Sequence, residues 1–199
     1  TVKPLSETVS LNYSLPDYDI KMSFLPTDFT QVNFELNQKM INLALQLLDL
    51  NKEDKVIDLF CGLGNFTLPI SRYVKAVVGI EGDSGLVERA KENARQNGVS
   101  NASFCKADLF EDVSGFEWFR GKKYNKALID PARSGAIEIV ELLPRLGVER
   151  LVYVSCNPST LARDTSRLID LGFTLSSAGV MDMFPQTAHV ESIALFLKK

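Results

Sequence analysis

Cys156 is the residue of this sequence best placed for nucleophilic chemistry. It lies in the segment Ser155–Pro158, between an apolar run and a stretch with helical spacing. A proline after a strand ends the ladder, so the side chains before it face the rim of a sheet. The N-terminus of a helix lowers the pKa of a nearby thiol and so favours the reactive thiolate. The alternative, a cysteine buried as a small apolar residue, fits Cys105 inside a strand and Cys61 inside a glycine turn better.

Two further groups can act beside such a thiolate. The segment Asp130–Arg133 closes another apolar run, and a proline follows Asp130 directly. Glu191 opens the last apolar run. From spacing alone, Glu191 is equally a solvated strand end and a carboxylate at the rim of a site. Arg133 is equally a surface ion-pair partner and a ligand for a carboxylate or a phosphate. Both pairs of alternatives stay open on the residues alone.

A glycine turn within Val56–Thr67 predicts a nucleotide-like ligand. An apolar run leads into Gly62-Leu63-Gly64, whose glycines let the backbone approach a ligand closely. The next apolar run ends at Glu81, where a carboxylate can bind ribose hydroxyls, and a third acid, Asp108, follows the run after that. A third glycine and a Gly-Lys-Ser/Thr sequence are missing, which disfavours a dinucleotide and a phosphate-cradling loop. S-adenosylmethionine, with a ribose and no phosphate, fits these residues better than an ordinary strand–helix turn does.

Together these groups match methyl transfer to carbon-5 of uracil. That carbon is too weak a nucleophile to attack a methyl sulfonium, but a thiolate added to carbon-6 converts the ring into an enolate that can. After methyl transfer, a base must remove the carbon-5 proton before the thiol leaves. The cofactor turn, Cys156 and a rim carboxylate such as Glu191 would supply these parts.

Alternating apolar runs and helical segments must position these residues. Strands are expected near 55–60, 76–81, 102–106, 125–130 and 149–155. Helices are expected after a cap at Asn33 and near 66–73, 84–97, 136–143 and 159–171. The runs at 173–182 and 190–197 have no helix between them, so they should pair antiparallel. This pattern predicts an α/β fold, a doubly wound, mostly parallel sheet with an antiparallel C-terminal hairpin.

The predicted fold brings the chemical groups to one edge of the sheet. Ligands of doubly wound folds bind outside the carboxyl ends of the parallel strands. The residues expected at those ends are Gly62, Glu81, Asp108, Asp130 and Cys156.

The first 25 residues follow a different pattern. Two short alternating runs flank Pro16-Asp17, which predicts a β-hairpin. A lone hairpin is marginal in water. We therefore interpret residues 1–25 as the end of a preceding central domain, and residues 26–199 as an S-adenosylmethionine-dependent catalytic domain.

Composition fits one compact, soluble, cytoplasmic domain. The chain has 199 residues, 45% of them hydrophobic, and shows neither an eighteen-residue apolar run nor a signal-peptide pattern. Its three scattered cysteines indicate neither a disulfide framework nor a metal site. The net charge of -3 is no basic signature of nucleic-acid binding, so RNA affinity is expected to come largely from other parts of the molecule. Nothing in the sequence indicates an obligate protein partner.

Five longer motifs occur in a fixed order from about Pro26 to the end of the chain. They are Asp28–Asn33, Asp58–Pro69, Asp130–Ala136, Ser155–Asp164 and Asp182–Glu191. In this order they resemble the RNA (uracil-5-)-methyltransferase family, and most closely its bacterial 23S ribosomal RNA branch. The resemblance implies a Rossmann-like class I methyltransferase fold and a ribosomal RNA substrate.

The resemblance also implies a role for each matching residue. Cys156 would be the nucleophile and Glu191 the base. Phe29 and Gln31 would touch the target base, and Asp130 would hydrogen-bond its edge. The cofactor pocket would be lined by Gln31, Phe60, Asn65, Glu81, Asp108 and Asp130, together with Gly62 of the turn.

Other parts of the family pattern are missing from these residues. Members of this branch carry an N-terminal RNA-binding barrel and a central domain with a cysteine-ligated iron–sulfur cluster, whereas this sequence has no clustered cysteines. We therefore expect the chain to be the catalytic portion of a longer enzyme.

Three alternatives remain. Transfer RNA enzymes of the same chemistry typically have Asp-Pro-Pro-Arg where this chain has Asp130–Arg133. A cytosine-5 DNA methyltransferase is disfavoured by Ser155–Pro158, because such enzymes place their cysteine in a Pro-Cys loop. A non-catalytic RNA-binding or assembly module would need neither Cys156 nor Glu191.

Overall fold

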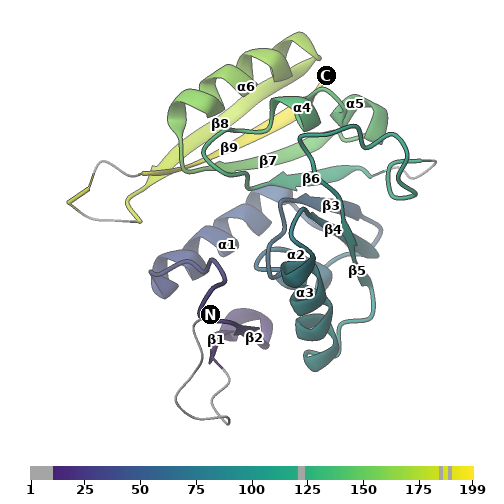
Figure 1. Cartoon of the computed structure of the whole chain (residues 1–199). Coiled ribbons are helices and arrows are strands. Elements are labelled where there is room, and N and C mark those ends of the chain that lie inside the picture. The colour runs from purple at the N-terminus through teal and green to yellow at the C-terminus, as the bar shows by residue number, and fades with distance from the viewer. Residues whose placement is uncertain (1–10, 121–123, 184–185, 188–189) are drawn as a thin grey trace.

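Side chains of the central strands alternate between two hydrophobic cores. The computed structural model describes residues 11–120, 124–183, 186–187 and 190–199. In β3 (Lys55–Leu59), Val56 packs into the first core and Ile57 into the second, as the period of two of an extended chain requires. Because both faces of such a strand are apolar, helices must cover both sides of the sheet (Figure 1).

Seven strands form the main sheet, in the order β5-β4-β3-β6-β7-β9-β8. Besides β3 they are β4 (Ala76–Glu81), β5 (Ala102–Lys106), β6 (Lys126–Ile129), β7 (Arg150–Ser155), β8 (Phe173–Met181) and β9 (Glu191–Lys198). Strands β3 to β7 pair parallel, and β9 pairs antiparallel with β7 and β8. The predicted doubly wound sheet with an antiparallel C-terminal hairpin is confirmed. The strand order reverses between β3 and β6, where such folds have their ligand crevice.

Helices from different parts of the chain cover the two faces. The first core contains α1 (Phe34–Leu48), α2 (Thr67–Ser71) and α3 (Ser84–Gln96). The second contains α4 (Ile137–Val140), α5 (Leu143–Leu146) and α6 (Pro158–Asp170). The predicted cap is confirmed, because the Asn33 side chain accepts a hydrogen bond from the N–H of Leu36 at 3.2 Å.

One expected helix is divided. The segment predicted as a single helix over 136–143 forms α4 and α5 instead, with Glu141 and Leu142 between them. Pro144 has no N–H to donate to the carbonyl one turn back, so it begins a new helix rather than extending the first.

A β-hairpin packs into the first core, together with α1, α2 and α3. It consists of β1 (Leu11–Leu15), the 3-10 turn η1 (Pro16–Tyr18) and β2 (Ile20–Phe24), with β1 and β2 antiparallel. Leu15, Ile20 and Met22 belong to the first core. The hairpin is thus present as predicted from Leu11 onward, whereas Val9, at its expected start, lies outside the described residues. It shares a core with the sheet, and its assignment to a preceding domain stays a prediction.

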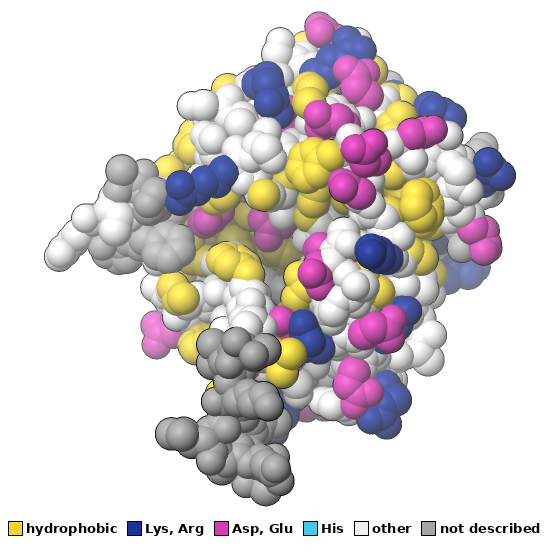
Figure 2. All heavy atoms as spheres, in the orientation of Figure 1, with side chains coloured by type: hydrophobic (Ala, Val, Ile, Leu, Met, Phe, Trp, Pro, Cys, Tyr) yellow, Lys and Arg dark blue, Asp and Glu magenta, His cyan; other side chains and the backbone are white. Residues whose placement is uncertain are grey.

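Acidic and basic side chains are mixed on one face of the molecule (Figure 2). On the face shown in Figure 2, Lys and Arg side chains are interspersed with Asp and Glu rather than gathered in a basic patch. No helix within the described residues is long and apolar enough to cross a membrane.

Candidate active site

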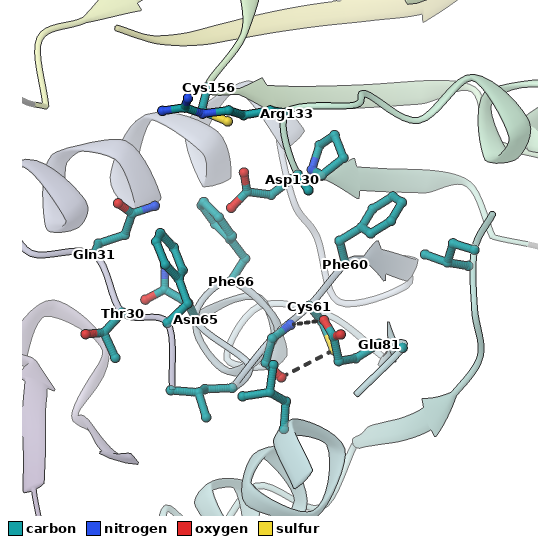
Figure 3. A pocket seen from close by; sticks show the side chains of 18 of the residues that line it. Thr30, Gln31, Phe60, Cys61, Asn65, Phe66, Glu81, Asp130, Arg133 and Cys156 are labelled. Carbon is teal, nitrogen blue, oxygen red and sulfur yellow. Dashed lines mark hydrogen bonds between the residues drawn. The ribbon is translucent and has the colours of Figure 1, made fainter. Parts of the chain in front are cut away.

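A cavity of about 550 Å³ opens at the carboxyl ends of the parallel strands. This volume lies in the range of ~300–1,000 Å³ that is usual for ligand pockets. Every site residue predicted from the sequence lines it: Phe29, Gln31, Phe60, Gly62, Asn65, Glu81, Asp108, Asp130, Cys156 and Glu191. Figure 3 shows the side chains converging from the glycine turn, the β6 and β7 ends and the loop before α1.

At one end of the cavity, Glu81 is tied to the glycine turn. Its Oε2 accepts a hydrogen bond from the N–H of Gly62 and its Oε1 accepts one from the N–H of Asp83, both at 3.0 Å. Gly62 has a φ of +54°, a conformation that glycine adopts without strain. The carboxylate at the tip of β4 is therefore oriented by two backbone donors, of which Figure 3 shows the Gly62 N–H.

An aromatic pair lies beside this carboxylate. Phe60 and Phe110 have ring centroids 5.6 Å apart, and both line the cavity. Asp108 positions Phe110, because its Oδ1 accepts the Phe110 N–H at 3.0 Å. Sequence reasoning missed Phe110, although its place two residues after a predicted strand-end acid was a usable signal.

Asn65 is held by two elements that are distant in sequence. Its Oδ1 accepts hydrogen bonds from the Tyr13 hydroxyl at 2.9 Å and from Asn37 Nδ2 at 3.0 Å, and its own Nδ2 donates to Asn37 Oδ1 at 2.9 Å. Tyr13 of the hairpin also lines the cavity. The sequence carried no signal for this contact, since nothing local relates β1 to the turn after β3.

The loop with Phe29 and Gln31 closes a side of the cavity. Asp28 anchors it to α3, because its Oδ1 accepts a hydrogen bond from Arg89 Nη2 at 2.6 Å. Phe29 itself is 76% exposed. A large apolar ring left in water at the mouth of a pocket is suited to stack on an incoming base.

At the other end of the cavity, three neighbouring strands bring the chemical groups together. Asp130 follows β6 and Cys156 follows β7, whereas Glu191 begins β9. In the antiparallel β7–β9 register Ser155 pairs with Ser192, so Cys156 and Glu191 occupy the next position along the two strands. The rim position of Glu191, which spacing left undecided, follows from this register. Phe184, Pro185, Ala188 and His189 of the last motif lie outside the described residues.

Burial and neighbouring charges at this end of the cavity raise the pKa values of Cys156, Glu191 and Asp130. Burial raises the pKa of the Cys156 thiol, the carboxylates of Glu191 and Asp130 raise it further, and Arg133 opposes them. The pKa lowering predicted from the helix N-terminus is therefore wrong for this structure, because burial and two nearby carboxylates outweigh that effect. Burial likewise raises the pKa of Glu191, against the influence of Arg133.

Asp130 is shifted furthest toward its neutral form. Burial raises its pKa to about 8, and the carboxylates of Glu191 and Asp58 contribute. The raised pKa favours the neutral form of Asp130, and a neutral carboxyl group can donate a hydrogen bond to a carbonyl oxygen.

The other cysteines are placed differently. Cys61 is 4% exposed and packs in the first core, and Cys105 is half-buried against the second. Within the part of the chain that the structure describes, no group of three or more His, Cys, Asp or Glu side chains is arranged to hold a metal ion.

Comparisons with known proteins agree with this geometry. The sequence model of the tRNA (uracil-5-)-methyltransferase family matches residues 5–199. A protein of Vesicomyosocius okutanii named 23S rRNA (uracil(1939)-C(5))-methyltransferase RlmD is 72% identical over the whole chain, which covers 45% of that protein. A protein of the same name from Xanthomonas oryzae pv. oryzae is 56% identical, again over the whole chain and 45% of the relative. The chain thus spans less than half the length of the curated relatives it matches.

A solved structure supports the same assignment. The tRNA (uracil-54, C5)-methyltransferase of Pyrococcus abyssi, in complex with S-adenosyl-L-homocysteine, superposes with a TM-score of 0.78 at 28% identity, over 94% of this chain and 44% of that one. The resemblance inferred from the five motifs is confirmed. The chain belongs to the tRNA (uracil-5-)-methyltransferase family.

Proposed function

We propose that this chain is the catalytic portion of a longer cytoplasmic enzyme that transfers a methyl group from S-adenosylmethionine to carbon-5 of a uridine in 23S ribosomal RNA. The observation that carries the proposal is the meeting of Cys156, Glu191 and the Glu81-ended glycine turn in one cavity. The RNA class is supported by the names of relatives that are 72% and 56% identical.

The glycine-turn end of the cavity fits the cofactor. Glu81 presents carboxylate oxygens suited to the ribose hydroxyls, and Phe60 with Phe110 forms an apolar wall suited to adenine. When bound, S-adenosylmethionine supplies an electrophilic methyl group on its sulfonium. The relative from Pyrococcus abyssi was solved with the demethylated form of the same molecule.

The Cys156 end fits the uracil chemistry. The thiolate form of Cys156 bonds to carbon-6, the 5,6 double bond opens to an enolate, and carbon-5 bonds to the methyl group as the methyl–sulfonium bond breaks. Glu191 then accepts the carbon-5 proton, the carbon–sulfur bond breaks, and the aromatic ring is restored. A raised pKa makes Glu191 a stronger base than a solvated carboxylate, and a protonated Asp130 can donate to a uracil carbonyl.

Arg133 completes this arrangement. It lines the cavity next to Cys156 (Figure 3) and lowers the pKa of that thiol against two carboxylates. Since the thiolate is the nucleophile, a cation at this place favours the attacking form.

The test is the RNA of a strain that lacks the full gene. Mass spectrometry of 23S ribosomal RNA should show one missing carbon-5 methyl group, restored by the wild-type gene and not by one that encodes Cys156→Ala. Loss of a methyl group from transfer RNA instead would favour the alternative substrate that the family description and the Pyrococcus abyssi relative indicate. Unchanged methylation of both RNAs would contradict the proposal.

A further inference from the structure

Asp164 is a charged side chain in the middle of α6 that is fully buried. Its Oδ2 accepts hydrogen bonds from the N–H of Ala136 at 2.8 Å and from the Tyr153 hydroxyl at 2.7 Å, and its Oδ1 accepts one from Arg163 Nε at 2.8 Å. A buried carboxylate is costly unless donors surround it. The two donors outside α6 belong to the loop after β6 and to the strand that leads to Cys156.

Arg163 extends this connection to the same loop. Its Nη2 donates to the carbonyl oxygen of Ser134 at 3.0 Å, while the guanidinium stays paired with Asp164. Gly135 lies against the pair so closely that a Cβ there would come within 2.6 Å of Arg163 Nη2 and 2.7 Å of Asp164 Oδ2. No space is therefore left for a side chain at position 135 between the loop after β6 and the Arg163–Asp164 pair.

Asn157 links the loop directly to the segment around Cys156. Its Nδ2 donates to the carbonyl oxygen of Arg133 at 3.0 Å, and its Oδ1 caps α6 by accepting the Ser159 N–H at 3.1 Å. Its own N–H donates to Ser155 Oγ at 3.1 Å, so the two residues that flank Cys156 are bonded to each other. The backbone of Arg133 and the backbone of Cys156 are thus fixed within one hydrogen-bonded unit.

We infer that Arg163 and Asp164 are positioning residues that hold the Asp130–Ala136 loop so that Arg133 stays against Cys156. The inference rests on the proposed function, in which Cys156 reacts as a thiolate, but it concerns residues to which that function assigns no role. It also gives a reason for the length of the Ser155–Asp164 motif, which runs a further two helical turns beyond the nucleophile. Both ends of the motif contact the loop.

The first measurement is the pH profile of Cys156 alkylation by iodoacetamide, followed by mass spectrometry of the Cys156 peptide. Arg133 lowers the pKa of this thiol, whereas Asp130 at the start of the same loop raises it. Asp130 is fixed to the sheet by its N–H, which donates to the carbonyl oxygen of Leu59 at 3.3 Å. Releasing the rest of the loop therefore moves Arg133 away from the thiol and should shift the midpoint of the profile to higher pH. A shift of half a pKa unit lowers the alkylation rate about threefold at pH values below the midpoint. Asp164→Asn should show such a shift in the full-length protein. Arg163→Ala should shift it in the same direction and guards against misfolding, because the Arg163 side chain is 47% exposed.

A matched control separates positioning from stability. Leu168→Ala removes a fully buried side chain one turn further along α6, away from the loop. It should lower the melting temperature and leave the alkylation profile at its wild-type midpoint. A wild-type midpoint in both Asp164→Asn and Arg163→Ala, or an equal shift in Leu168→Ala, overturns the inference.

Single-turnover methyl transfer provides the second measurement. At saturating cofactor and RNA, Asp164→Asn should be slowed by about 10–100-fold per folded molecule, with unchanged affinity for S-adenosylhomocysteine, because misplaced groups affect the reaction rather than cofactor binding. A wild-type rate would overturn the inference. Absence of methylation by the wild-type protein would refute the proposed function alone, since the alkylation profile needs neither RNA nor cofactor.

Discussion

Glu81 shows how one side chain ties the cofactor turn to the neighbouring strand. Its carboxylate is held by the N–H groups of Gly62 and Asp83 at 3.0 Å. If Glu81 is the proposed acceptor for the ribose, Glu81→Ala removes a charge-assisted hydrogen bond, so affinity for S-adenosylhomocysteine should fall by about 1.5–3 kcal/mol, or roughly 10–150-fold. Calorimetry on this chain without RNA measures the change. Glu88→Ala, at an exposed position of α3, is the control and should bind as wild type does; equal affinities for Glu81→Ala and wild type would contradict the assignment.

Cys156 and Glu191 occupy neighbouring positions on antiparallel strands but act at different steps of the proposed mechanism. Cys156→Ala should abolish both methylation and any covalent protein–RNA species. Glu191→Gln should still allow addition and methyl transfer, and should then accumulate a methylated adduct, because elimination waits for removal of the carbon-5 proton. Denaturing electrophoresis with radiolabelled cofactor detects the adduct in the full-length protein.

Two outcomes would contradict these separate roles. One is an adduct formed by Cys156→Ala, and the other is normal turnover by Glu191→Gln. Cys105→Ala is the matched control, since Cys105 lies in β5 among apolar neighbours and should not affect methylation.

Asp130 makes stability depend on pH. Its pKa of about 8 in the folded protein lies above its ordinary value of 3.8, so the folded state holds a proton that the unfolded state releases between these pH values. Folding stability contributed by this group therefore falls as pH rises through that window. Asp130→Asn removes the titration, and its melting temperature should exceed that of wild type by more at pH 9 than at pH 5, by about 2–4 °C for each kcal/mol. Scanning fluorimetry at the two pH values checks this, and an equal difference at both would be the contrary result.

At the scale of elements, the β1–β2 hairpin contributes Tyr13 to the lining of the cavity proposed to bind the cofactor. The Tyr13 hydroxyl donates to Asn65 in the turn after β3, and the hairpin packs in the first core. Tyr13→Phe deletes this hydrogen bond and keeps the ring, so affinity for S-adenosylhomocysteine should fall by about 0.5–1.5 kcal/mol, or roughly 2–13-fold. Calorimetry decides, with Tyr73→Phe at a more exposed tyrosine as the control. Wild-type affinity in Tyr13→Phe would mean that Asn37 alone is enough to orient Asn65.

At the scale of the whole molecule, charge limits RNA binding. The chain has a net charge of -3, and acidic and basic side chains are mixed on the face shown in Figure 2. Extruding a uridine from its stack costs a few kcal/mol, and phosphate contacts normally offset that cost. This chain alone should bind 23S ribosomal RNA fragments far more weakly than a full-length relative does. Fluorescence anisotropy at matched salt compares the two, and tight, sequence-selective binding by the chain alone would refute the expectation.

Much of this fold could be predicted from local sequence because its strands and helices differ in period. Val56 and Ile57 face opposite cores in an extended chain whatever follows them, and Asn33 caps α1 through its own neighbour three residues on. The division of the helix predicted over 136–143 also has a local cause, because Pro144 cannot donate the backbone hydrogen bond that would continue α4. The prediction of a single helix followed the apolar periodicity of the segment and did not take this proline into account.

The sequence by itself therefore determined the order of elements, the strand ends where Glu81, Asp130 and Cys156 lie, and the type of chemistry that they allow. Only the tertiary structure decided which distant groups meet. Glu191 faces the site because Ser155 pairs with Ser192 across β7 and β9, and strand register depends on the packing of the whole sheet. The direction of the Cys156 pKa shift was also decided by the tertiary structure. Burial and the carboxylates of distant residues raise this pKa, and they outweigh the lowering effect of the α6 N-terminus, which is all that the sequence indicates.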